Sequence, residues 1–339
     1  MRATGSRTNY RRVVGSPEVV LSAGNMNSIA TVMADLIANY VDLQVNGYVG
    51  VDFNDPHTPL HRIHEAAEAM RKDGVVAALP TIITGAADVM IGCMSKLVQA
   101  IEEQEETRAL FRGIHMEGPF LSPVPGYIGA HPVEHARPQD LDLLGRLCDA
   151  AGDHLRLVTL APEVDRGGRM TRFLTQRGIV VAAGHTDASL DQLRCALDEG
   201  LQLFTHLGNG CPRKMDRHDN ILWRAMRLRD RLKITLIADG FHVPAVVFPT
   251  LLEWFGGDRV AVVSDAISAA GLGPGTYQLG SRSVVIGPDR ACRDASGEHF
   301  VGSASRMQDA ERWLADTLQL ELATRRQLLF DNPRSWLGL

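Results

Sequence analysis

The chain has 339 residues, of which 45% are hydrophobic and 22% are charged, the balance of a globular protein with a large buried core. Its 35 basic and 40 acidic residues give a formal net charge of −5, so it lacks the basic surplus of a nucleic-acid-binding protein. The 32 glycines and the 6% aromatic content favour an α/β enzyme with many tight turns.

The cysteines indicate a reducing compartment. Five are present, without a C-x-x-C pair: Cys93, Cys148, Cys195, Cys211 and Cys292. This odd, scattered set argues against a disulfide framework and against a thiolate zinc site. No apolar run reaches the roughly 18 residues of a membrane span, and residues 1–40 lack the apolar stretch of a secretion signal. We therefore expect a cytoplasmic protein that neither enters a membrane nor binds nucleic acid.

Short apolar runs rich in β-branched residues alternate with helical patterns along the chain. The eight runs predicted as strands are residues 40–45, 75–82, 111–116, 155–160, 179–183, 201–205, 232–238 and 259–264. The predicted helices between them are residues 61–72, 87–105, 139–151, 189–199, 221–229 and 243–255. A further helix is predicted over residues 26–38, before the first strand. This alternation is typical of an α/β protein with a parallel sheet.

Polar residues at the strand ends decide between a closed barrel and an open sheet. They are Asp42, Gln44, Asn46, Thr81, Thr84, His115, Glu117, Glu163, His185, His206, Asp239, His242 and Asp265. Such groups at the ends of all eight strands converge on one point only in a (β/α)8 TIM barrel. In a doubly wound sheet they would spread along a line at the strand tips. We therefore predict the barrel.

The segments outside the barrel are short. Residues 276–287 alternate as in a β hairpin, and residues 305–322 and 322–330 have helical spacing. No shift in composition marks a linker. The expected organisation is an N-terminal extension over residues 1–39, a catalytic barrel over 40–310 and a C-terminal helical extension over 311–339.

Three strand ends carry residues that bind metals. Glu117, His185 and His206 occupy equivalent positions, so they can meet at the barrel mouth as one carboxylate and two imidazoles. This set suits a catalytic Zn²⁺ and leaves a position open for water. The alternative interpretation is that each histidine only forms a hydrogen bond with a loop.

Asp265 follows a wholly apolar strand, where an unpaired charge is costly. Beside a water molecule activated by a metal it can accept a proton and pass it to the leaving group. The alternative interpretation is an N-cap of the following turn. Its place at the eighth strand end favours the catalytic role.

Eight motifs in this order resemble the N-acetylglucosamine-6-phosphate deacetylase family of the amidohydrolase superfamily. They are residues 42–47 (DLQVNG), 115–122 (HMEGPFLS), 129–132 (GAHP), 160–163 (LAPE), 184–187 (GHTD), 205–209 (THLGN), 238–243 (ADGFHV) and 264–266 (SDA). The resemblance covers about residues 40–310. It implies a barrel of the metal-dependent hydrolase type, with Asp265 as general base and acid and with Glu117, His185 and His206 as metal ligands.

The resemblance also implies residues that bind substrate and the number of metals. His131, Asn209 and His242 would face the sugar or its phosphate. Gln44 and Asn46 replace the His-x-His of many superfamily members, and neutral amides are poor zinc ligands. We therefore expect one divalent metal ion per chain, with Zn²⁺ as the first candidate and Fe²⁺, Co²⁺ or Mn²⁺ accepted by the same donors.

Two departures from the family pattern affect the expected substrate. The flanking β-sandwich domain of the family is expected to be largely absent, and a homodimer could cover the barrel face that it would leave exposed. The loop after His206 also departs from the family's usual sequence. In this loop Gly210, Arg217 and His218 are the candidates for binding a phosphate, ahead of Arg213 and Lys214. A solvated basic loop is the alternative.

The predicted function is removal of the acetyl group from an N-acetylated amino sugar, with N-acetylglucosamine 6-phosphate as first candidate. An alternative keeps the chemistry and takes an unphosphorylated N-acyl sugar, an N-acyl amino acid or a cyclic amide. A third hypothesis is a barrel that binds a sugar without hydrolysing it. The complete set of Glu117, His185, His206 and Asp265 argues against the third.

Overall fold

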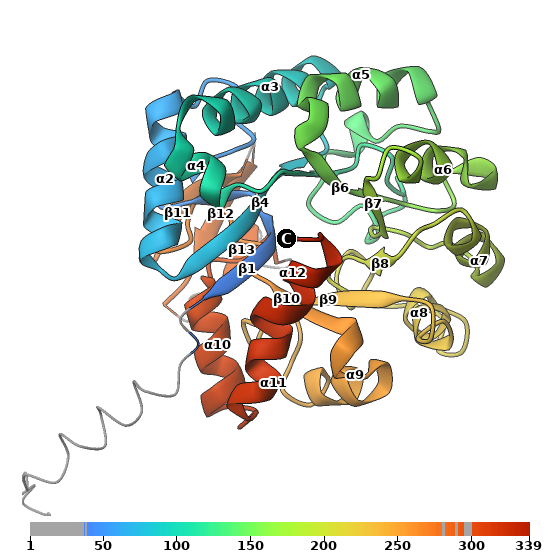
Figure 1. The fold of residues 1–339 in the computed structure, drawn as a ribbon. Helices are drawn as coiled ribbons and strands as arrows, with labels where there is room; N and C mark the ends of the chain where they lie inside the picture. Colours follow the sequence, from blue (N-terminus) through green and yellow to red (C-terminus); the bar gives the residue numbers. More distant parts are fainter. Residues whose placement is uncertain (1–36, 38, 280–281, 289–290, 295–299) are drawn as a thin grey trace, which may run out of the picture. The chain divides into compact units, whose positions relative to one another are not determined.

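The computed structural model describes residues 37, 39–279, 282–288, 291–294 and 300–339 (Figure 1). Residues 26–38, predicted as a helix, lie outside these ranges except for Ile37. Within the described ranges, no helix combines the length and the apolarity that crossing a membrane requires.

Eight parallel strands form a barrel in which the order of strands follows the order along the chain (Figure 1). They are β1 (Tyr40–Val45), β4 (Val75–Ile83), β5 (Ile114–Glu117), β6 (Leu155–Leu160), β7 (Val180–Ala183), β8 (Leu203–Phe204), β9 (Lys233–Ile237) and β10 (Val260–Val263). The first and last strands meet through a parallel bridge between Val45 and Ala266. There the Asp265 amide donates to the Gln44 carbonyl over 3.0 Å. The predicted (β/α)8 barrel is confirmed, with strand bounds that differ from the predicted runs by a few residues.

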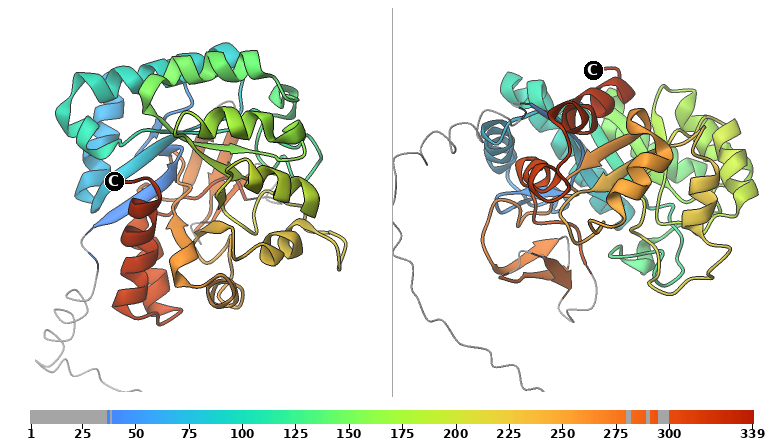
Figure 2. Two further views of the ribbon diagram at one scale, coloured as in Figure 1. Left: turned by 45° about the vertical axis from the view of Figure 1, so that its right-hand side comes forward. Right: turned by 90° about the horizontal axis from the view of Figure 1, so that it is seen from below.

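Helices cover the outside of the barrel (Figures 1 and 2). They are α2 (Leu60–Lys72), α3 (Ala87–Glu103), α4 (Glu105–Leu110), α5 (Leu141–Ala151), α6 (Arg169–Thr175), α7 (Leu190–Asp198), α8 (Ile221–Arg227) and α9 (Phe248–Phe255). Side chains cap the amino ends of two of these helices. Asp140 accepts a hydrogen bond from the Leu143 amide at the start of α5, and Ser189 forms a capping box with Gln192 at the start of α7. The short helices α4 and α6 were not predicted, because six or seven residues show too little of the helical period.

The lower part of the barrel interior, at the amino ends of the strands, is apolar. Inward side chains such as Val41, Leu43 and Leu157 pack there against Trp336 and Leu337. The tryptophan ends α12 (Asn332–Trp336), which lies in the middle of the ring of strands in Figure 1. Among the described residues, the amino ends of the strands therefore enclose a packed core, which leaves the carboxyl ends for a site.

A polar layer lies above this core. His115 Nε2 lies 2.8 Å from Thr159 Oγ1, which is 2.7 Å from Thr205 Oγ1. On its other side, His115 Nδ1 lies 3.4 Å from Thr81 Oγ1. Burial lowers the pKa of His115 to about 4, so the ring is neutral. His115, one of the polar residues noted at the strand ends, thus belongs to the core beneath the site.

The remaining elements lie at the two ends of the barrel, except for the C-terminal helices α10 and α11, which continue the outer ring of helices (Figure 1). They are β2 (Gly47–Tyr48), β3 (Val51–Asp52), β11 (Gly275–Leu279), β12 (Arg282–Ile286), β13 (Cys292–Asp294), α10 (Met307–Asp316), α11 (Leu322–Arg326), η1 (Val133–His135), η2 (Gly152–His154), η3 (Arg166–Gly168), η4 (Gly257–Arg259) and η5 (Gln327–Asp331). The antiparallel pair of β11 and β12 confirms the predicted hairpin. The sheet of β11 to β13 and the helix α12 lie at opposite ends of the barrel (Figure 2, right).

Candidate metal and catalytic site

The three predicted metal ligands lie together at the carboxyl ends of the strands. Glu117 ends β5, His185 follows β7 and His206 follows β8. One ligand atom from each lies within 4.8 Å of the others, and all three residues are buried. Glu117 Oε1 lies 2.8 Å from His206 Nε2 and 3.5 Å from His185 Nε2. A divalent ion fits this donor set, because two imidazole nitrogens and a carboxylate oxygen already converge on one point.

The hydrogen bonding of His185 supports a ligand role. Its Nδ1–H donates to the Tyr127 carbonyl over 2.9 Å, which leaves the lone pair of Nε2 toward Glu117. A hydrogen bond of this kind fixes the tautomer and orientation of a metal-bound histidine. Burial alone would raise the pKa of Glu117, but the interactions with His185 and His206 outweigh it and lower that pKa, so the carboxylate is ionised.

His131 lies at the edge of this cluster. Its Nε2 is 3.2 Å from His185 Nε2 and 3.7 Å from Glu117 Oε2. The Thr84 amide donates to His131 Nδ1 over 3.4 Å, which places the ring proton on Nε2. The Nε2–H therefore points toward the cluster, where it can donate to an oxygen of a bound substrate.

Asp265 is held by the two amides that replace His-x-His. Gln44 Nε2 donates to Asp265 Oδ1 over 3.1 Å, and Asn46 Nδ2 donates to the same oxygen over 2.8 Å. Gln44 Nε2 also donates to Glu117 Oε2 over 3.1 Å. Burial raises the pKa of Asp265, and the nearby carboxylate of Glu117 adds to this. Both amides thus act as donors that orient carboxylates.

The backbone is strained at three of these residues. The φ values of His185, His206 and Asp265 are 50°, 34° and 47°. These values lie in the left-handed region, which residues other than glycine rarely adopt. Each such residue costs about 1–3 kcal/mol and persists only where neighbours hold it. The His206 amide donates to Thr235 Oγ1 over 2.8 Å, for example. Strain at these three positions fits a site built for function.

Asp42 supports Asp265 from below, a role that the sequence did not indicate. Its two carboxylate oxygens accept from the Ser264 amide over 3.1 Å and from the Ser264 hydroxyl over 2.5 Å. Burial raises the pKa of Asp42 to about 6, although these hydrogen bonds oppose the shift. Asp42 therefore fixes the residue that precedes Asp265, and it does not face the metal ligands as a reactive group.

His242 forms a carboxylate–imidazole pair with Asp239. His242 Nδ1 lies 2.6 Å from Asp239 Oδ2, and Ser303 Oγ donates to the same oxygen over 3.3 Å. Burial alone would raise the pKa of Asp239, but the interaction with His242 lowers it. The pair fixes the imidazole so that Nε2 points away from Asp239. Ser303 gave no signal in the sequence, because its segment contains no strand-end motif.

The predicted substrate-binding residues on the loop over residues 208–220 differ in their burial. Asn209 Nδ2 is buried and has no hydrogen-bond partner among the described residues, so it can donate to a ligand. Arg217 and His218 are exposed, and the structure does not bring them into the buried cluster. The nearby Arg224 is already committed to Asp187 and Asp219, over 2.9 and 2.7 Å.

Gly210 packs against His185, one of the predicted metal ligands. Its φ is +62°, and a Cβ built on it would lie 2.8 Å from His185 Nδ1. Replacement by alanine should push the His185 ring off the Tyr127 carbonyl and lower metal affinity about 10- to 100-fold, the cost of losing such a supporting contact. Titration with Zn²⁺ against a competing chelator measures this.

Gly208→Ala is the matched control. Gly208 also has positive φ, +99°, but a Cβ there has nothing within 4 Å. It should lower thermal stability through backbone strain while keeping wild-type metal affinity. Equal metal affinities for the Gly208 and Gly210 variants would show that the contact with His185 is unimportant.

Comparisons with known proteins agree on one family of enzymes, although no family model matches the chain. The chain is 27% identical over 308 residues to N-acetylglucosamine-6-phosphate deacetylase of Bacillus subtilis (strain 168), covering 90% of this chain and 76% of that protein. It is 31% identical over 304 residues to N-acetylgalactosamine-6-phosphate deacetylase of Shewanella sp. (strain ANA-3), covering 89% and 74%. The crystal structure of N-acetyl-D-glucosamine-6-phosphate deacetylase from Mycobacterium smegmatis matches with a TM-score of 0.80 at 27% identity, covering 89% and 78%.

Proposed function

The chain belongs to the N-acetylglucosamine- and N-acetylgalactosamine-6-phosphate deacetylases of the amidohydrolase superfamily, and we propose that its substrate is N-acetylglucosamine 6-phosphate. The reaction hydrolyses the linear amide of an N-acetylhexosamine 6-phosphate to acetate and the amino sugar phosphate. The observation that carries the proposal is the buried cluster of Glu117, His185 and His206 beside Asp265.

Glu117, His185 and His206 would hold one divalent ion, with Zn²⁺ as first candidate because imidazole nitrogen and carboxylate oxygen are among its usual ligands. Fe²⁺, Co²⁺ and Mn²⁺ accept the same donors. When bound, such an ion supplies a Lewis acid that polarises the amide carbonyl and activates water.

The side chains around this cluster supply proton transfer and orientation. Asp265 accepts a proton from the attacking water and then donates it to the sugar nitrogen as the C–N bond breaks. The Nε2–H of His131 is placed to donate to the carbonyl oxygen, where negative charge develops. His242, fixed by Asp239 through Nδ1, is placed to accept at Nε2 from a hydroxyl group of the sugar. Acetate and the free amine are then released.

The phosphate group is assigned to the loop after β8. A dianion in a partly buried site needs charged or N–H donors. Asn209 offers a buried donor, and the cation Arg217 and the imidazole of His218 are exposed on the same loop.

Replacing Arg217 by alanine should raise the KM for the phosphorylated substrate about 10- to 100-fold, which is about 1.4 to 2.7 kcal/mol. Turnover of the unphosphorylated sugar should change little. Steady-state kinetics on both substrates measure this. The matched control is Arg112→Ala, which removes an exposed arginine just before the amino end of β5, away from the site, and should leave both KM values unchanged. Equal losses on both substrates would show that Arg217 only supports the loop.

The substrate assignment is tested by comparing kcat/KM for three compounds: N-acetylglucosamine 6-phosphate, its galactosamine epimer and N-acetylglucosamine. The proposal predicts the highest value for the first. Preference for the epimer would assign the chain to the activity named for the Shewanella relative. No preference for phosphate would favour an unphosphorylated N-acyl substrate, the alternative suggested by the unusual loop.

A further inference from the structure

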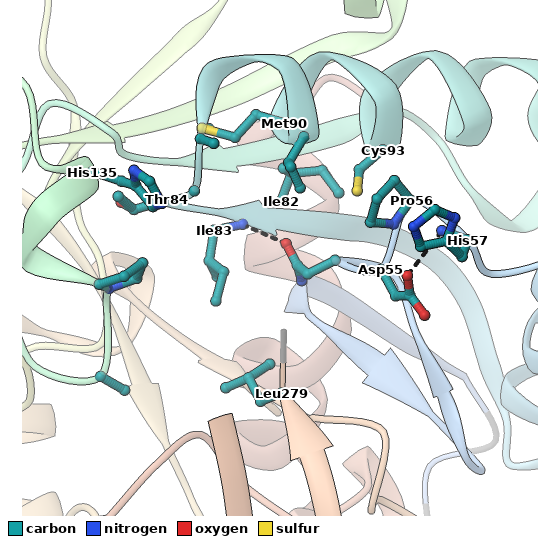
Figure 3. A pocket seen from close by; sticks show the side chains of 16 residues that line it. Asp55, Pro56, His57, Ile82, Ile83, Thr84, Met90, Cys93, His135 and Leu279 are labelled. Carbon is teal, nitrogen blue, oxygen red and sulfur yellow. Dashed lines mark hydrogen bonds between the residues drawn. The ribbon is translucent and has the colours of Figure 1, made fainter. Parts of the chain in front are cut away.

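A mostly apolar cavity of about 340 Å³ lies beside the metal ligands and is not used by the proposed reaction. It lies between α3 and the loops at the end of β4 (Figure 3). Its apolar lining includes Ile82, Ile83, Val89, Met90 and Leu279. Figure 3 shows Thr84 and His135 at one end, with Cys93 and His57 at the other. The apolar wall suits an alkyl group, and the carboxylate of Asp55, beside His57, disfavours an anion.

This cavity is lined by residues next to His131 and next to Glu117, since its lining residue Ile83 pairs with Glu117 across β4 and β5. Thr84, Ala130 and Pro132 line the cavity. The Thr84 amide donates to His131 Nδ1, and the other nitrogen of that ring lies 3.7 Å from Glu117 Oε2. The cavity therefore lies next to residues that flank or contact His131. Alanine and threonine at this point are small enough to leave room for a chain beside the ring.

The barrel order places the cavity across the site from the phosphate loop. The cavity adjoins the end of β4, the second strand around the barrel, and residues 208–220 follow β8, the sixth. Three strands separate them in either direction, so they lie on opposite sides of the axis. In a trans amide, the alkyl group on the carbonyl carbon and the substituent on the nitrogen lie on opposite sides of the C–N bond. With the sugar held near β8, the acyl chain points toward β4.

We propose that this cavity is an acyl pocket, and that the enzyme hydrolyses N-acyl hexosamine 6-phosphates with acyl chains longer than acetyl. This inference rests on the proposed function. The step is the same: water adds to the acyl carbon, the C–N bond breaks, the nitrogen takes a proton, and a longer carboxylate leaves. An acetyl methyl group ends beside His131, whereas a butanoyl chain extends past Thr84 and Ala130 into the cavity.

The test is the ratio of kcat/KM for N-butanoylglucosamine 6-phosphate to that for N-acetylglucosamine 6-phosphate. The wild-type ratio should lie within tenfold of unity. Ala86→Leu, at the cavity wall where α3 begins, should lower the ratio about tenfold (about 1.4 kcal/mol) by filling the space that the chain occupies. Leu279→Ala enlarges the cavity and should raise the ratio. Ala87→Leu is the matched control, because Ala87 adjoins Ala86 but does not line the cavity.

The outcomes separate this inference from the proposed function. A wild-type ratio below one tenth would overturn the acyl pocket while leaving deacetylation intact. Equal ratios for wild type, Ala86→Leu and Leu279→Ala would overturn it as well. Wild-type protein loaded with metal that hydrolyses neither compound would contradict the proposed function itself, and the acyl pocket with it.

Discussion

Replacing Asp265 by asparagine is expected to lower kcat about 10²–10⁴-fold while leaving the bound metal in place, because general acid–base catalysis is typically worth this much. The asparagine oxygen can still accept from Gln44 and Asn46, as Asp265 Oδ1 does. Its amide nitrogen, however, cannot accept a proton from water. The loss should therefore fall on kcat, with KM little changed. Steady-state kinetics with N-acetylglucosamine 6-phosphate, together with elemental analysis, measure both parts.

Asp258→Asn is the matched control for this variant. It makes the same chemical change on a side chain that is 73% exposed. Asp258 precedes the amino end of β10, whereas Asp265 follows the carboxyl end of that strand. It should keep wild-type kinetics. Near wild-type kcat for Asp265→Asn would show that Asp265 is structural, and the general base would then be another residue.

The double variant His185→Ala, His206→Ala is expected to abolish metal binding, whereas wild-type protein should hold about one ion per chain. Two of the three ligands are removed, and a single carboxylate at Glu117 does not retain a divalent ion against dilution. Elemental analysis of protein purified without chelator measures this. Far-ultraviolet circular dichroism checks that the barrel remains folded.

His61→Ala, His154→Ala is the matched control, because it removes two imidazoles far from the cluster in sequence and outside it. It should hold as much metal as the wild type. Two tightly bound equivalents in the wild type, or metal retained by the His185, His206 double variant, would contradict the single site.

The barrel could be predicted because its strands are buried on both faces. The bounds of β1 and β6 match the predicted apolar runs, since almost every residue in them is buried. The strand β8 has only two residues, Leu203–Phe204, because the chain turns at Thr205 toward the site. A hydrophobic pattern cannot show where such a turn begins, so the predicted run was too long.

The site was predictable where residue type and strand position agree. Glu117, His185 and His206 are residue types that bind metals, and they occupy equivalent positions at the carboxyl ends of their strands. The structure brings them together. The support around them carries no such signal. Tyr127 acts through its backbone carbonyl, which any residue could supply. Asp42 resembles a reactive carboxylate in the sequence, and only its two hydrogen bonds with Ser264 show its supporting role.

Acetate release from N-acetylglucosamine 6-phosphate by wild-type protein carrying one equivalent of Zn²⁺ is the most direct test of the central claim. We expect equimolar acetate and glucosamine 6-phosphate from a site that consists of Glu117, His185, His206 and Asp265. A chelator should abolish the release of acetate, and added metal should restore it. Absence of acetate from this compound and from its galactosamine epimer, with the metal bound, would contradict it.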